Sequence, residues 1–459
     1  MSTVERRRPA GPNRMDQPML QTTGQTAGDT LVEGLVEGAQ RHPYAVTFFP
    51  GDNEGIDIGD LEDSSARRAA ALSAQGVGPG TLTGLLVTPG AEFLADFFAV
   101  LRAGGVVTLL PTSTRAAHYD LEVDRLSQLI RLAGVSCLVT GGPLAERLCA
   151  ANPELRPVHP DGGHRRSALA PVHTGQRALV LFTAGRTGPP KAVARSHGQL
   201  MSGMQAFRGA LGMTSDDILV QWLPLSHPLS LFGLLSQVLY GGTTHVFPPA
   251  VCHGRPGDIL RCIAEHHANV TIGTNSSYEL LCTVATALAS DVDLGRWRVA
   301  LNGGEPVQAG TVDRFRRVFA GHGVRRTTMH PMYYVTEAML AVTGKLPDTA
   351  PDVLTIDQRT LFDSGKIRFI RSEQARMRSY VSSGVPVPGI DFRIADAEGA
   401  DAGNGVLGEI QIRSATVGGG YHRDLRATLK SMDGGWFRTG DTGFLWRGQL
   451  FVAGYEDES

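Results

Sequence analysis

The stretch Leu179-Val-Leu-Phe-Thr-Ala-Gly-Arg-Thr-Gly-Pro-Pro-Lys191 joins a short apolar run to a loop rich in glycine, threonine and proline. The run from Ala178 to Phe182 is continuous and partly β-branched or aromatic, which is typical of a buried strand. The segment that begins at Ser196 carries apolar residues at helical spacing. The order of strand, loop and helix places the loop where α/β proteins bind ligands.

This loop has the composition of an anion-binding loop. Its hydroxyls and glycines would surround an anion with donors and tolerate positive φ, while Arg186 and Lys191 add positive charge. The candidate donors are Thr183, Gly185, Thr187 and Gly188. We therefore predict polyphosphate binding, although no Gly-Lys-Ser/Thr triplet closes a Walker loop and, taken alone, an ordinary surface turn explains the loop equally well.

The composition indicates a globular protein of several subdomains. A length of 459 residues exceeds one ordinary core and predicts two or three subdomains. The net charge of −2 argues against a nucleic-acid partner that is bound through bulk charge. No run of 18 apolar residues occurs, so no membrane insertion is expected.

The N-terminal residues predict a disordered leader. Residues 1–27 lack periodicity and are rich in Pro, Gly, Gln, Thr and Arg. Arg6-Arg7-Arg8 is not followed by an apolar h-region, so the leader does not have the form of a signal peptide. The expected location is cytoplasmic.

The cysteines and histidines give little reason to expect a structural metal. The five cysteines are dispersed without a CxxC pair, which fits a reducing compartment and no structural zinc. The run Glu265-His266-His267 lies late in an expected helix, where the helix dipole favours histidine. Metal binding is the weaker interpretation of that run.

Strands and helices alternate along most of the chain. A strand over 82–87, a helix over 92–103 and a strand over 106–110 form a βαβ unit, which builds parallel sheets. Further strands are expected at 137–140, 218–222, 243–247, 269–272 and 297–301, and further helices at 121–133, 229–239, 257–267, 278–288 and 311–320. This alternation over about 28–370 predicts doubly wound α/β architecture.

The pattern changes near residue 371. Short strands separated by Gly/Asp turns follow, and helical periodicity is nearly absent, which predicts a small antiparallel β subdomain over about 371–455. The preceding stretch, 344–372, is irregular and charged. It would be a linker or an inserted element on the surface.

Four loops fall at the carboxyl ends of expected strands, where ligands collect in open α/β sheets. They are 183–191, 223–228, 302–306 and 332–337. In the last of these, Thr336 and Glu337 supply hard oxygen ligands suited to Mg²⁺. Taken alone, a helix N-cap followed by an acidic residue is the commoner explanation of such a pair.

Other loop residues have both a binding and a structural interpretation. Gly303-Gly304 would let a flat ligand approach the backbone, or would form a tight turn. Tyr333 would stack on a base or lie in the core. Asp441 would accept bonds from two ribose hydroxyls or form an Asx turn, and His227 would border a pocket or be satisfied by ordinary hydrogen bonds.

Together, these loops resemble those of the adenylate-forming superfamily, which includes acyl-CoA synthetases, peptide-synthetase adenylation domains and luciferases. The matching segments are Thr183 to Val193 (its phosphate loop), Tyr333 to Glu337 (its Tyr-Gly-x-Thr/Ala-Glu motif), Gly408 to Ile410 and Arg438 to Asp441. The resemblance covers roughly residues 30–457. It implies two doubly wound subdomains with mostly parallel sheets and a small distorted antiparallel β-barrel subdomain, which form a large N-terminal AMP-binding domain over 28–455.

Within the superfamily, the sequence is most similar to the fatty acyl-AMP ligases. The similar segments are Trp222 to His227, Trp297 to Val307, Thr336 to Leu340 and Gly435 to Phe444. These ligases carry an inserted segment that disfavours coenzyme A, and 344–372 lies where that insertion would be.

The resemblance assigns a role to each loop. A carboxylic acid, fatty or of a related acyl type, would attack the α-phosphorus of ATP to give an acyl-adenylate, which would pass to an acyl carrier protein or a polyketide or peptide synthetase. The phosphate loop and Mg²⁺ would offset the transition-state charge. The implied catalytic residues are Lys191, His227, Thr336 and Glu337, the last two also as metal ligands; the implied nucleotide site comprises Thr183, Gly185, Arg186, Thr187, Gly188, Gly303, Gly304, Glu305, Pro306, Tyr333 and Asp441.

Several positions depart from the family pattern. Ala184, Arg186 and Ala192 alter the phosphate loop, and Tyr334 replaces a glycine beside the adenine site. Residues 456–459 match the family's hinge, so the resemblance implies that the given sequence stops before the family's small C-terminal domain with its catalytic lysine. Arg186 would then replace the charge of that lysine or mark altered chemistry. A coenzyme A ligase and a non-catalytic nucleotide- or acyl-binding relative are the alternatives.

Overall fold

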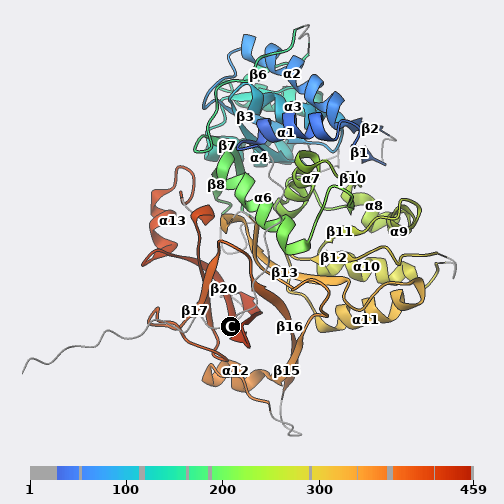
Figure 1. Ribbon diagram of the computed structural model, residues 1–459. Coiled ribbons are helices and arrows are strands. Elements are labelled where there is room, and N and C mark those ends of the chain that lie inside the picture. Colours follow the sequence, from blue (N-terminus) through green and yellow to red (C-terminus); the bar gives the residue numbers. More distant parts are fainter. Residues whose placement is uncertain are drawn as a thin grey trace, which may run out of the picture.

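The computed structural model describes residues 28–50, 54–112, 119–161, 165–183, 189–288, 292–338, 340–369, 376–417 and 419–455 (Figure 1). Three of the sequence predictions fall outside these ranges. They are the leader 1–27, the loop residues Gly185, Arg186, Thr187 and Gly188, and the hinge 456–459.

The first sheet is six-stranded and contains the strand that leads into the loop at 183–191. Its order is β6-β5-β3-β4-β7-β8, and only the last pair is antiparallel. The strands are β3 (Leu82–Val87), β4 (Val106–Pro111), β5 (Cys137–Val139), β6 (Arg156–Val158), β7 (Arg177–Phe182) and β8 (Ala192–Ser196). The predicted βαβ unit is confirmed, with α3 (Ala91–Arg102) between β3 and β4.

Helices cover both faces of this sheet, because successive side chains of a strand point to opposite faces. Val107 and Leu109 of β4 lie in the core that contains α3, whereas Val106 and Leu110 lie in a second core with Leu126 of α4. The helices here are α2 (Ile58–Ala74), α3, α4 (Tyr119–Ala133) and α5 (Pro143–Ala151). This two-sided burial is the doubly wound arrangement that the alternation predicted.

The second sheet has a parallel half in the order β13-β12-β11-β9-β10-β1, and β2 pairs antiparallel at its edge. Its strands are β1 (Val46–Phe49), β2 (Glu54–Asp57), β9 (Ile218–Gln221), β10 (Thr243–Val246), β11 (Val270–Gly273), β12 (Val299–Asn302) and β13 (Met329–Val335). The N-terminal strand β1 thus belongs to the same sheet as β10, with Thr47 opposite Thr244.

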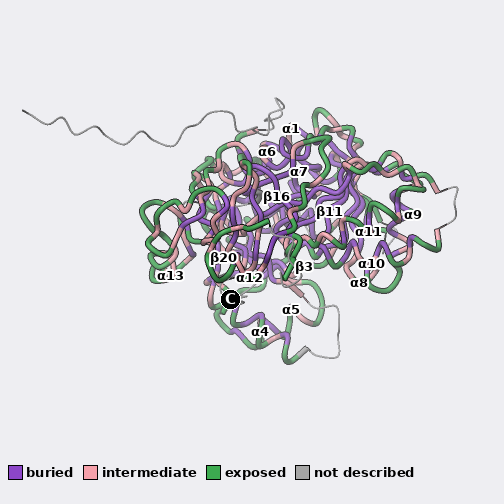
Figure 2. The backbone as a smooth tube through the Cα atoms, turned by 90° about the horizontal axis from the view of Figure 1, so that it is seen from below, coloured by how far each residue is buried: buried purple, intermediate pink, exposed green. Residues whose placement is uncertain are grey.

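The helices around the second sheet include one that is buried along its whole length. All residues of α7 (Pro228–Tyr240) are buried, and Figure 2 shows α6 and α7 within the purple interior. The others are α1 (Leu31–Arg41), α6 (His197–Leu211), α8 (Pro249–Gly254), α9 (Pro256–Glu265), α10 (Asn275–Ala285) and α11 (Ala309–Phe319). Ser196 caps α6 in a capping box with Gln199, as expected for a helix that begins there.

The second sheet continues from β13 into an antiparallel half. The order runs β13-β14-β16-β21-β20-β18-β17, and β15 and β19 pair with β16 and β20. The strands are β14 (Leu340–Gly344), β15 (Val353–Asp357), β16 (Met377–Pro386), β17 (Asp391–Ala395), β18 (Gly408–Arg413), β19 (Met432–Asp433), β20 (Trp436–Trp446) and β21 (Gln449–Tyr455). The predicted antiparallel region is therefore present, and α13 (Leu425–Lys430) lies beside it (Figure 1).

The stretch 344–372 is not irregular in its described part, which corrects the expectation. It contains β15 and the short helix α12 (Gln358–Ser364), so a simple linker is wrong for these residues. Asp357 caps α12 through its side chain. Within the described ranges, none of the helices has the length and apolar character needed to cross a membrane.

Candidate active site

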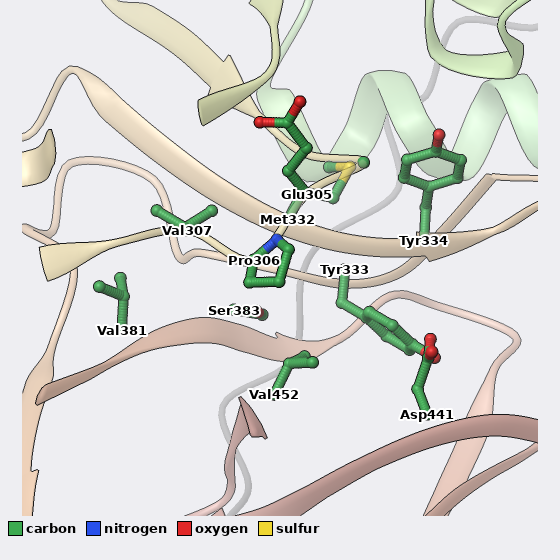
Figure 3. A pocket seen from close by; sticks show the side chains of 11 residues that line it. Glu305, Pro306, Val307, Met332, Tyr333, Tyr334, Val381, Ser383, Asp441 and Val452 are labelled. Atoms are coloured by element: carbon green, nitrogen blue, oxygen red, sulfur yellow. The ribbon is translucent and has the colours of Figure 1, made fainter. Parts of the chain in front are cut away.

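A pocket lies where the parallel and antiparallel halves of the second sheet meet. It is open to solvent, and its cavity volume is about 30 Å³. Its walls come from the loop after β12 (Gly304, Glu305, Pro306, Val307), from β13 (Met332, Tyr333, Tyr334), from β16 (Val381, Ser383), from β20 (Asp441) and from β21 (Val452), as Figure 3 shows. Two of the four loops chosen from sequence, 302–306 and 332–337, therefore meet at one site.

Tyr333 and Asp441 form a hydrogen-bonded pair in this pocket. The phenol of Tyr333 donates to Oδ2 of Asp441 at 2.7 Å, and the two side chains point toward one another in Figure 3. Burial, followed by the nearby Asp441 charge, raises the pKa of Tyr333 well above its usual value. The phenol therefore stays protonated and fixes the carboxylate of Asp441.

Gly304 occupies a turn that a larger residue would strain. Its φ is +86°, and an added Cβ would lie 3.3 Å from the hydroxyl of Tyr334 and 3.4 Å from Nε2 of His227. That hydroxyl and that ring nitrogen are hydrogen-bonded at 2.9 Å. His227 and Tyr334 thus lie together beside Gly304, and Tyr334 but not His227 is among the residues that line this pocket.

Glu305 lines the pocket with its stem but directs its carboxylate elsewhere. The carboxylate accepts bonds from the backbone N–H of Ser276 at 2.9 Å and from its hydroxyl at 2.7 Å. Ser276 lies in the first turn of α10, where the helix dipole favours a negative charge. In Figure 3 the carboxylate points away from Asp441, so Pro306 and the backbone form this wall of the pocket.

A second cluster surrounds Glu337 in the turn after β13. The hydroxyl of Tyr421 donates to Oε1 of Glu337 at 2.8 Å, and the guanidinium of Arg195 donates to the main-chain oxygen of Glu337. The ammonium of Lys191 lies 4.6 Å from the centroid of the Tyr421 ring, a cation–π distance. Lys191 and Glu337 therefore both contact Tyr421, and the roles of these residues and of Thr336 stay a prediction.

The ends of the loop at 183–191 are held together. The N–H of Thr183 donates to the carbonyl of Lys191 at 2.9 Å, and the N–H of Lys191 donates to the hydroxyl of Thr183 at 3.1 Å. Thr183 therefore holds the two ends of the loop together through these two hydrogen bonds. The four donors between these ends, Gly185 to Gly188, lie outside the described residues.

Sequence reasoning missed Tyr421 and Arg195. Arg195 is 1% exposed, and burial lowers the pKa of its guanidinium to about 10, so it remains charged at neutral pH. A charged residue inside the apolar strand β8 was the available signal. Tyr421 follows three glycines, and the sequence around it gave no signal of a functional residue. Its bridge to Val193 appears only in the fold.

An α/β domain with a pocket and a basic loop at its strand ends has the form of a nucleotide-dependent enzyme. Residues 35–422 match the model of the AMP-binding enzyme family. The chain belongs to this family.

Two curated relatives are 28% identical to this chain over the aligned residues. It is 28% identical over 415 residues to the medium-chain-fatty-acid–[acyl-carrier-protein] ligase JamA of Moorena producens, an alignment that covers 85% of this chain and 70% of that protein. It is 28% identical over 411 residues to the 4-hydroxyphenylalkanoate adenylyltransferase of Mycobacterium tuberculosis, with 82% and 64% covered. The chain thus spans about two thirds of the length of these relatives.

Solved structures agree in fold. One from a study of fatty acyl-adenylate ligases from E. coli and L. pneumophila has a TM-score of 0.86 at 25% identity and covers 94% of this chain and 80% of its own. The adenylation domain of a keto acid-selecting peptide-synthetase module has a TM-score of 0.85 at 23% identity, covers 95% and 82%, and supports the fold alone.

Proposed function

We propose that this chain activates a carboxylic acid, fatty or of a related acyl type, with ATP to form an acyl-adenylate. The observation that carries the proposal is the pair of oriented carboxylates around β13. Asp441 is fixed by Tyr333, and Glu337 is fixed by Tyr421 beside Lys191. Membership in the AMP-binding family and the names of the relatives support the same chemistry.

In this reaction a carboxylate oxygen of the substrate forms a bond to the α-phosphorus of ATP. The bond from that phosphorus to the bridging oxygen of the β-phosphate breaks, and pyrophosphate leaves. Lys191 and the loop at 183–191 would offset the charge on the phosphates. Asp441 would accept bonds from the ribose hydroxyls, and the wall from Gly303 to Pro306, with Tyr333, would hold adenine.

The residues around Glu337 fit a magnesium ion. The hydroxyl of Tyr421 donates to Oε1 of Glu337, and no hydrogen bond to Oε2 is found among the described residues, so Oε2 is a hard oxygen that could bind the ion. Mg²⁺ bound there would neutralise phosphate charge. Glu337 and Thr336 are the ligands that we propose.

We further propose that the acyl group passes to the thiol of an acyl carrier protein or of a carrier domain in a polyketide or peptide synthetase. The relative from Moorena producens is named for transfer of this kind. Coenzyme A is the competing acceptor, and 344–372 would disfavour it. Equal rates of transfer to coenzyme A and to a carrier protein would reject this part of the proposal.

Exchange of labelled pyrophosphate into ATP tests the central step. A panel of medium- and long-chain fatty acids and aryl-alkanoic acids should contain at least one acid that drives exchange by this chain. Failure of every acid, in a chain that still binds AMP by calorimetry, would overturn the ligase function and leave a nucleotide-binding protein.

Replacing Asp441 by asparagine should weaken AMP binding about tenfold or more. The amide removes the negative charge and one acceptor, and hydrogen bonds to a charged group contribute about 1.5–3 kcal/mol. Calorimetric titration with AMP measures the change. Asp433→Asn, an exposed residue of β19, is the matched control and should bind AMP normally. Equal affinity of Asp441→Asn and wild type would exclude the ribose role.

A further inference from the structure

Three potential metal ligands converge on the side of the second sheet that carries α9. They are His245 of β10, Cys262 of α9 and His266, which caps the end of that helix. One ligand atom from each lies within 4.8 Å of the others. Cys262 and His266 are four residues apart, which places them on one helix face. In the sequence, Cys262 and His266 form the pattern Cys-x-x-x-His, and the sheet adds His245 as the third ligand.

The histidine of the sheet is held in a fixed orientation. His245 is 3% exposed and stacks on Phe48 of β1, its partner in the parallel pair, with ring centroids 4.9 Å apart and planes at 18°. Its centroid lies 4.3 Å from that of His266. Within the described residues, neither ring nitrogen of His245 nor the thiol of Cys262 has a recorded hydrogen bond. A buried imidazole usually has such a partner, and a metal ion would supply it.

Metal binding at this cluster would release a proton. A divalent ion that binds Cys262 would displace the proton of its thiol and form a metal–thiolate bond.

The donor set selects the class of metal. One thiolate and two imidazoles suit zinc and similar transition metals, whereas magnesium and calcium prefer oxygen ligands. Zinc lies about 2.0–2.1 Å from nitrogen and 2.3 Å from sulfur, so the ligands must close inward by roughly 1 Å. His266 is exposed at the helix end and can make this movement, and a water molecule can complete the tetrahedron from the solvent side.

We propose that His245, Cys262 and His266 form a zinc site that ties the end of α9 to β10. The site shares no residue with the pocket between β12, β13 and β20, and β10 and α9 lie away from β16 in Figure 1. It is therefore independent of the proposed ligase function. The site has one cysteine and two histidines. A search of the sequence for CxxC pairs therefore could not find it.

Titration of the chelator-treated chain with Zn²⁺ and Co²⁺ tests the site. Wild type should bind one Zn²⁺ per chain by calorimetry, release a proton, and melt at a temperature that rises with Zn²⁺ concentration. The Co²⁺ form should show a sulfur-to-cobalt charge-transfer band in the near ultraviolet. Cys262→Ser should lose that band, and His266→Ala, an exposed change that spares the core, should weaken Zn²⁺ binding at least tenfold.

Matched controls separate this site from other cysteines and histidines. Cys282→Ser removes another buried thiol, and His253→Ala another exposed histidine, and both should bind Zn²⁺ as wild type does. A Co²⁺ spectrum without the thiolate band in wild type would overturn the proposal. So would Zn²⁺ affinity that is unchanged in both Cys262→Ser and His266→Ala.

Discussion

Replacing Glu337 by glutamine should reduce acyl-adenylate formation by about 10²–10³-fold, the range typical of losing one preorganised electrostatic contact to a transition state. The amide can still accept the hydrogen bond from Tyr421, so the local packing is kept. It loses the negative charge that a hard cation requires. The loss should therefore fall on catalysis rather than on folding.

Pyrophosphate exchange measures this effect, and calorimetry with AMP, which carries no β- or γ-phosphate, shows whether the pocket survives. Tyr421→Phe is the informative comparison, because it keeps the Glu337 charge and removes only the bond that orients it. We expect a smaller loss there, about tenfold. An exchange rate of Glu337→Gln within twofold of wild type would reject Glu337 as the metal ligand.

Replacing Gly384 by alanine should destabilise the protein by about 3 kcal/mol or more. Gly384 lies in β16 with φ of +89°, and an added Cβ would lie 1.9 Å from the carbonyl oxygen of Gly344. A non-glycine residue in this region costs about 1–2 kcal/mol, and overpacking against rigid backbone costs about 1–3 kcal/mol more. Urea unfolding followed by circular dichroism measures the change.

Gly365→Ala is the matched control for this prediction. Gly365 also has a positive φ, of +67°, but nothing lies within 4 Å of an added Cβ. It should therefore cost about 1–2 kcal/mol, from the backbone conformation alone. Equal destabilisation by both substitutions would contradict the view that close approach of β14 and β16 is what requires Gly384.

The parts of the fold that were predictable from sequence are the strands and helices whose own apolar residues show that they are buried. The run from Leu82 to Val87 and the apolar helix that became α7 were found because continuous or periodic burial leaves a local signal. The strand β15 and helix α12 were missed. They are short, and Val353 at the start of β15 is 43% exposed, so their composition resembles that of a loop.

The sequence allowed several residues of the candidate site to be named, but it did not show which of them contact one another. Tyr333 and Asp441 were named from their motifs, yet their bond joins positions 108 residues apart across separate strands. The bond from Tyr421 to Glu337 joins positions 84 residues apart. The strand order of the second sheet creates the first pair, and Tyr421 of the second pair bridges to Val193 of β8 in the first sheet. No local pattern contains either arrangement. The contact between His245 of β10 and Cys262 of α9 was also not predictable from any local pattern.

The position of β1 also bears on how the chain is synthesised. Because Thr47 pairs with Thr244, strand β1 has only the edge strand β2 as a partner in its sheet until β10 has been synthesised. Meanwhile the six-stranded sheet, complete by Ser196, can close on its own. Long-range pairing of this kind slows folding, since loop closure precedes the contacts that stabilise it. The pair of β1 and β2 is thus separated from the rest of its sheet until β10 has been synthesised.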